Sequence, residues 1–128
     1  MKLECEGQPA ILDADEEQVA KRIRKLRNCG PCSFASLTDA EGNSIHVVGG
    51  GATCMVERFV VSAAKRFRAF QGRPNPVFPD GTILAYAAGE IRMKSDEWLL
   101  SETVAELFLC FLRGRPYPQR VSWRTTPD

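Results

Sequence analysis

The chain has 128 residues, 44% of them hydrophobic, and its 17 basic and 16 acidic residues give a formal net charge of +1. This size predicts a single compact domain over residues 1–128, with enough apolar side chains for one core. The balanced charge argues against nucleic acid or an anionic membrane as a partner. The sequence has no run of about 18 apolar residues, so we expect no membrane-spanning helix.

The N-terminus and the cysteines indicate a reducing compartment. Residues 1–6 lack the hydrophobic core of a signal peptide. The chain has five cysteines, an odd number that leaves at least one unpaired, and a chain without a signal rarely depends on disulfides. We therefore expect a cytoplasmic protein.

The first predicted element is a helix over residues 13–28. Asp13 or Asp15 can cap it, and acidic residues in the first turn and basic residues in the last turn suit the helix dipole. Its narrow apolar stripe consists of Val19, Ala20, Ile23 and Leu26. The basic residues on the rest of the helix surface are typical of a solvated face. A nucleic-acid footprint is the less favoured alternative, because no aromatic residues lie between them.

After this helix the apolar period changes from 3.6 to 2, which predicts strands. Segments 33–38 and 44–48 flank a polar loop at 39–43 and predict a β-hairpin. The glycine triplet at 49–51 predicts a tight reversal into a strand over 53–62. A phosphate cradle at the triplet is disfavoured, since it lacks both the G-x-G-x-x-G pattern and a P-loop lysine.

The next segment is another strand, predicted at 66–70, followed by an irregular proline-rich loop at 71–81. Segments 82–86 and 90–94 are also strand-like, and we expect a kink or bulge at 88–89 between them. These strands extend the antiparallel series that begins with the hairpin.

The C-terminal part predicts a helix over 101–113 and a short closing strand over 121–124. Ser101 is the expected N-cap, and Gly114 ends the helix. The wide apolar stripe of this helix is formed by Val104, Leu107, Phe108, Phe111 and Leu112.

The order of these elements predicts an α+β fold. We expect a single antiparallel sheet of about five to six strands, with an N-terminal helix and a C-terminal helix packed on it and a short final strand. The helices cover one face of this sheet. Its other face is then either solvated or in contact with a partner.

The motif at residues 29–32, Cys-Gly-Pro-Cys, matches the letters of the thioredoxin redox loop. Thioredoxin chemistry places the first thiol at the start of a helix, where the dipole lowers its pKa. Here the motif follows a predicted helix and precedes a predicted strand. We therefore favour a simple turn and keep a thiol redox protein using Cys29 and Cys32 as an alternative.

The remaining chemistry of the sequence favours a binding protein over an enzyme, with no cofactor and no catalytic residues. His46 is the single histidine, the carboxylates are scattered, and no Ser or Cys has a nucleophile motif around it. Zinc held by the Cys29–Cys32 pair with His46, Cys54 or Cys110 is disfavoured, because no second closely spaced ligand pair occurs.

Strand alternation predicts several exposed side chains of the types that anchor protein interfaces. The candidate partner-binding residues are Arg58, Arg66, Arg68, Tyr86, Arg92 and Trp98. For Tyr86 and Trp98, a core position with a polar handle is an equal alternative.

From Ala88 to Trp123 the chain resembles the Imm1 family of immunity proteins from bacterial polymorphic-toxin systems. The pair Gly89-Glu90 opens a short strand, an amphipathic helix ends in a Phe-rich turn, and Arg115 and Pro118 precede a terminal Val-Ser-Trp strand. Upstream, the order of the elements agrees more loosely.

The resemblance implies a protein that binds a cognate toxin domain, of nuclease or deaminase type, and blocks its activity. It implies no active-site residues, and we expect a monomer or a weak homodimer. A small-ligand or homo-oligomeric interaction module is the third alternative; a closed apolar pocket would favour it, and a flat polar sheet would not.

Overall fold

A computed structural model describes residues 1–27, 32–86 and 89–126 of the chain, except for the side chain of Tyr86. Its described part has an antiparallel six-stranded sheet in the order β1-β2-β3-β4-β5-β8, a two-stranded sheet of β6 and β7, and two α-helices. This arrangement confirms the predicted α+β fold. The elements are β1 (Lys2–Cys5), α1 (Glu16–Arg24), β2 (Phe34–Thr38), β3 (Ser44–Gly50), β4 (Thr53–Val60), the 3-10 turn η1 (Val61–Ala63), β5 (Lys65–Gln71), β6 (Thr82–Tyr86), β7 (Gly89–Met93), α2 (Ser101–Arg113) and β8 (Val121–Thr125).

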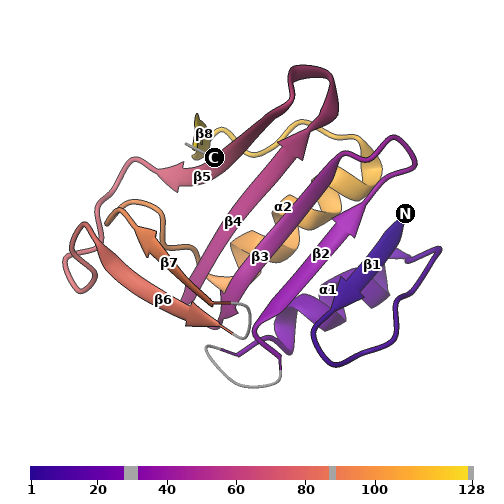
Figure 1. Ribbon diagram of the computed structural model, residues 1–128, viewed down its shortest axis with the longest axis horizontal. Helices are drawn as coiled ribbons and strands as arrows, with labels where there is room; N and C mark the ends of the chain where they lie inside the picture. Colours follow the sequence, from indigo (N-terminus) through magenta and orange to yellow (C-terminus); the bar gives the residue numbers. More distant parts are fainter. Residues whose placement is uncertain (28–31, 87–88, 127–128) are drawn as a thin grey trace.

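Both helices lie on the same face of the six-stranded sheet (Figure 1). Val19 and Ile23 of α1 and Leu107 and Phe108 of α2 are fully buried in one core with the inward-facing residues of the sheet. Each such side chain contributes about 1.5–3 kcal/mol by leaving water. The sheet residues of this core are Leu3, Ala35, Leu37, Ile45, Val47, Cys54, Val56, Ala69 and Val121.

The β6–β7 hairpin packs on the opposite face of the sheet. Val48 of β3 and Met55 of β4 point away from the helices, because they alternate with core residues, and both are buried against Leu84, Met93 and Trp98. Figure 1 places this hairpin over the end of the sheet where β3 and β4 meet. The face opposite the helices is therefore covered at one end.

Two strand features differ from the sequence-based expectation. The strand β1 was not predicted; it pairs with β2, and Ile11 caps its other edge through backbone hydrogen bonds of 2.8 and 2.9 Å with Leu3. Strands β6 and β7 pair only with each other, so they do not extend the main sheet. Tyr86 lies opposite Gly89 in register, so β6 and β7 are an antiparallel pair; the kink expected at 88–89 falls partly on residues 87–88, which lie outside the described residues.

The helix ends also refine the expectation. Asp15 caps α1 and forms a capping box with Gln18, as one of the two predicted caps. The helix ends at Arg24, earlier than predicted, and residue 28 lies outside the described residues. Ser101 is not the cap of α2: Leu100 holds that position without a side-chain hydrogen bond, and the Ser101 N–H donates to the Gly51 carbonyl.

Candidate functional site

A row of polar residues crosses the whole six-stranded sheet on the face opposite the helices. Its members are direct cross-strand partners, so their side chains lie side by side on one face. From β1 to β8 they are Glu4, Ser36, His46, Glu57, Arg68 and Arg124. We call this set the polar row.

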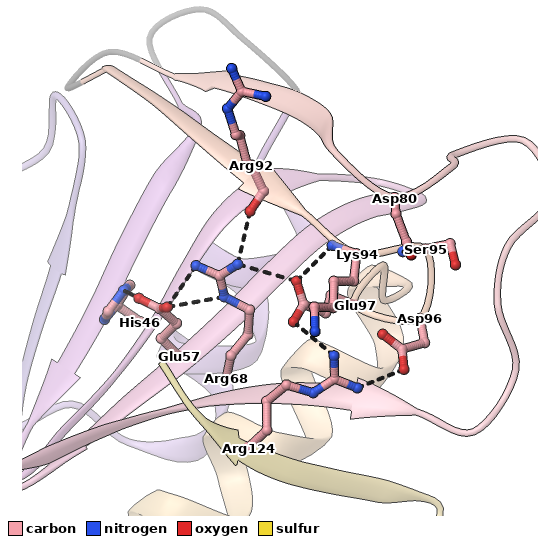
Figure 2. A network of polar contacts seen from close by, with 10 residues as sticks. All are labelled: His46, Glu57, Arg68, Asp80, Arg92, Lys94, Ser95, Asp96, Glu97 and Arg124. Carbon is pink, nitrogen blue, oxygen red and sulfur yellow. Dashed lines mark hydrogen bonds and ion pairs between the residues drawn. The ribbon is translucent and has the colours of Figure 1, made fainter. Parts of the chain in front are cut away.

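The centre of the polar row is a buried ion pair between Glu57 and Arg68. The carboxylate accepts from Nε of Arg68 at 3.0 Å, and Nη2 lies at 2.9 Å; Nε2 of His46 lies 3.3 Å from its other oxygen (Figure 2). Burial raises the pKa of Glu57, but the hydrogen bond from His46 and the charge of Arg68 outweigh it, so the pKa lies below its ordinary value. Glu57 is therefore held as a carboxylate.

Glu97 joins the two arginines of the row from outside the sheet. Arg68 and Arg124 face each other across β5 and β8, an unfavourable pairing of like charges. Glu97 lies between them: Oε1 is 3.1 Å from Arg68 and also accepts from the Lys94 backbone N–H at 2.8 Å, and Oε2 is 3.4 Å from Arg124 (Figure 2). Its side chain is only 3% exposed, so these contacts are strong and costly to remove.

The same network ties the β6–β7 hairpin and the turn after it to the sheet. Arg68 donates to the Arg92 carbonyl at 2.9 Å, and Arg124 contacts Asp96 at 2.6 Å. At the edge of the network the Ser95 N–H donates to Asp80 at 2.8 Å, and hydrogen bonding to Ser95 lowers the pKa of that carboxyl. The hairpin is thus fastened by the apolar contact of Trp98 and by this ionic contact.

A cleft of about 450 Å³ opens beside the network. Four of its lining residues are basic and two are acidic. Arg68 and Arg124 are held by carboxylates, whereas the side chains of Arg92 and Lys94 are exposed and pair with none of the described residues. The cleft is therefore suited to an acidic group. Its charged lining residues are Arg68, Asp80, Arg92, Lys94, Glu97 and Arg124.

The hairpin covers one end of the sheet face opposite the helices. The rest of this face is open to a partner. We call it the outer sheet surface, and its members are Lys2, Glu4, Ser36, Thr38, Ser44, His46, Phe59 and Arg66. Within it, the guanidinium of Arg66 lies 5.9 Å from the ring centroid of its cross-strand partner Phe59. The surface combines both signs of charge, hydroxyl groups and one aromatic ring.

The predicted partner-binding residues differ in how exposed their side chains are. Arg66 and Arg92 are exposed, on the outer sheet surface and beside the cleft respectively. The exposure expected for Arg68 is wrong. Its side chain is only 15% exposed and forms ion pairs with Glu57 and Glu97.

The exposure expected for Arg58 and Trp98 is also wrong. Arg58 points toward the helix side of the sheet and is partly buried among aromatic rings. Trp98 is 8% exposed and stacks on Phe78 with ring centroids 4.2 Å apart, so its core alternative is correct. The side chain of Tyr86 lies outside the described residues.

The structure does not test the thiol redox alternative, which stays a prediction. Cys29 lies outside the described residues, and Cys32 directly precedes Ser33 and β2. Burial raises the pKa of Cys54 to about 12, so this thiol stays protonated at neutral pH. Among the residues that the structure describes, no three His, Cys, Asp or Glu side chains gather closely enough to hold a metal ion.

Comparisons with known proteins add no identity. No protein-family model and no curated protein matches the chain. Separately, no helix in the described ranges is long and apolar enough to cross a membrane.

Proposed function

We propose that this chain is an immunity protein that binds a bacterial toxin domain, of nuclease or deaminase type, and blocks its activity. The proposal extends the resemblance of residues 88–123 to the Imm1 family. The observation that supports it best is the outer sheet surface, a polar sheet face that remains uncovered while both helices and the hairpin pack elsewhere. In this proposal the chain acts by binding alone, without catalysis or a cofactor.

Rigidity of this face favours tight binding. The side chains of His46, Glu57 and Arg68 are already fixed by one another, so few rotamers are lost when a partner docks beside them. A preformed surface loses less entropy on binding than a flexible loop does. The expected interface is of the usual size, about 800 Å² per partner.

Phe59 and Arg66 are the proposed anchors. Aromatic and arginine side chains contribute most to protein interfaces, and these two are already stacked on each other. Lys2 and Glu4 at the other end pair with each other at 3.6 Å, so both signs of charge face the partner. The toxin face that docks here is therefore expected to be of mixed charge, with a modest dependence of affinity on salt.

The test is growth rescue in a bacterial host that expresses the toxin domain encoded beside this chain. The wild-type chain and the control variant Lys21→Glu, a charge reversal on the helix side, are expected to restore growth. Arg66→Glu, which changes the net charge equally, is expected to fail while keeping its melting temperature. Absence of rescue by the wild-type chain would remove the proposal.

A further inference from the structure

Arg58 of β4 is enclosed by residues of β5, of β8 and of the segment after α2. The guanidinium of Arg58 lies over three aromatic rings: 4.7 Å from the centroid of Trp123, 4.9 Å from that of Phe67 and 5.3 Å from that of Tyr117. Arg58 is the cross-strand partner of Ile45 and Phe67, so it lies on the helix side of the sheet, away from the polar row. This cluster is the Arg58 cage.

The cage lacks an acceptor. Among the described residues, Arg58 has neither an ion pair nor a hydrogen bond, although its Nε atom is fully buried. The indole N–H of Trp123 in the same cage is also buried without an acceptor. Buried arginines normally carry a carboxylate partner, and buried N–H groups are normally hydrogen-bonded. Two unsatisfied donors thus lie together with a positive charge that aromatic rings stabilise but that no described carboxylate neutralises.

A pocket of about 260 Å³ opens onto this cage. Tyr117 and Phe111 give it aromatic walls, and the hydroxyl groups of Ser44 and Ser62 lie at it without a hydrogen bond to any described residue. Burial raises the pKa of Tyr117, so its phenol also remains a donor. Arg58, Tyr117 and the two serines can each donate a hydrogen bond at this pocket, and none of them does so to a described residue.

The charge around the pocket selects the ligand. Arg58 is its single basic lining residue, and Asp39 is its single acidic one. The carboxylate of Asp39 already accepts from the Glu41 N–H at 2.9 Å and from the Asn43 N–H at 3.0 Å. One guanidinium neutralises one negative charge, and a second charge on the ligand would be repelled by Asp39. A singly charged anion is therefore favoured over a phosphate dianion.

We propose that the Arg58 cage is a binding site for a single carboxylate group attached to an apolar or aromatic body. The planar guanidinium offers paired N–H donors that match the two carboxylate oxygens, and the aromatic walls accept the apolar body. The three rings hold the guanidinium in place before binding. Arg58 itself lies on the helix side of the sheet, and its pocket extends to Ser44 and Phe59 at the end of the outer sheet surface. The test below uses no toxin, so its outcome is independent of the proposed function.

The test is a titration of the ¹⁵N-labelled chain with sodium benzoate, followed by NMR. The chain has two tryptophans, so the indole region shows two signals, and Trp123→Phe assigns them. We expect a saturable shift of the Arg58 Nε–H and Trp123 indole signals. The indole signal of Trp98, on the opposite face of the sheet, serves as the internal reference and should stay in place.

Matched ligands and variants decide the result. Benzamide, the neutral analogue, is expected not to bind, and Arg58→Met is expected to weaken benzoate binding about tenfold or more. Arg58→Lys retains the positive charge but lacks the paired N–H donors of the guanidinium, so it should bind benzoate at intermediate strength. This variant keeps the test valid if Arg58→Met unfolds. Equal binding of benzamide, tighter binding of inorganic phosphate, or unchanged affinity in both Arg58 variants would overturn the proposal. N-acetylphenylalanine, a mimic of a peptide C-terminus, distinguishes a peptide source from a free carboxylate by its affinity relative to benzoate.

Discussion

Arg68 and Arg124 are direct cross-strand partners in β5 and β8, and one carboxylate, that of Glu97, contacts both guanidinium groups. Two like charges would otherwise repel across the strands. Because Glu97 belongs to the turn after β7, this contact also fixes the β6–β7 hairpin on the sheet. The edge of the main sheet and the position of the hairpin therefore depend on the same side chain.

Glu97→Gln should be strongly destabilising. It removes the charge between the two arginines while preserving the side-chain volume, and loss of one partner of a buried ionic network costs about 3 kcal/mol. Urea unfolding measures the change. Glu102→Gln is the matched control, because the Glu102–Arg24 pair is exposed and contributes about 1 kcal/mol or less. Equal losses in the two variants would contradict the proposed role of Glu97.

Acidification should destabilise the chain partly through Glu57. Its pKa in the folded state is lower than in the unfolded state, so its contribution to stability is complete above the ordinary carboxyl pKa, about 4.5. As the pH falls below that value, Glu57 is protonated in the unfolded state before it is protonated in the folded state. Its contribution to stability is therefore lost progressively on acidification. Melting temperatures of the wild type and Glu57→Gln, measured from pH 7 to pH 3, should converge on acidification. Parallel curves would show that Glu57 does not titrate in this way.

The hairpin should open as a unit when its apolar anchor is removed. Trp98→Ala takes away a side chain that packs on Phe78, Val48 and Met55. We expect hydrogen exchange of the amides in residues 82–93 to accelerate about a hundredfold, while α2 stays protected. Ile83→Ala, which truncates an exposed side chain of the same hairpin, should have little effect. Uniform acceleration over the whole chain would instead indicate that the hairpin and the sheet unfold together.

Gly50 and Gly51 should respond to alanine for different reasons. A Cβ at Gly50 would lie 2.3 Å from the backbone carbonyl of Leu26, so the segment after α1 has to move away from β3. At Gly51, φ is +67° and nothing lies within 4 Å, so alanine meets only backbone strain of about 1 kcal/mol. We expect Gly50→Ala to lower the melting temperature several times more than Gly51→Ala does. The opposite order would show that this close approach does not limit stability.

Local patterns were sufficient to predict both helices and most strands. The wide stripe of α2, with Leu107 and Phe108, and the alternation around Ile45 and Val47 each determine a buried face. The four residues of β1 are too few to show a period. The position of the β6–β7 pair depends on a cluster that brings Leu84 together with Val48 and Met55, which are distant from it in sequence.

The candidate site was harder to predict than the fold. Arg68 and Arg92 were candidates because of their residue type, but the polar row exists only through the register of six strands. Glu97 lies 29 residues from Arg68, in a turn whose sequence carries no signal for this contact. The alternation in β3 and β4 does place His46 and Glu57 on the noncore face, so a comparison of strand registers could have found that pair.

The most direct test of the proposed function is the affinity of the purified chain for the purified toxin domain encoded beside it, measured by calorimetry. We predict a one-to-one complex whose dissociation constant rises at least about thirtyfold in Arg66→Glu, because an arginine that anchors an interface contributes about 2 kcal/mol or more. Lys21→Glu should leave the affinity within about twofold of the wild type, since exposed charges remote from an interface contribute little. No binding by the wild-type chain, or equal weakening by the two variants, would contradict the assignment of the outer sheet surface as the docking face.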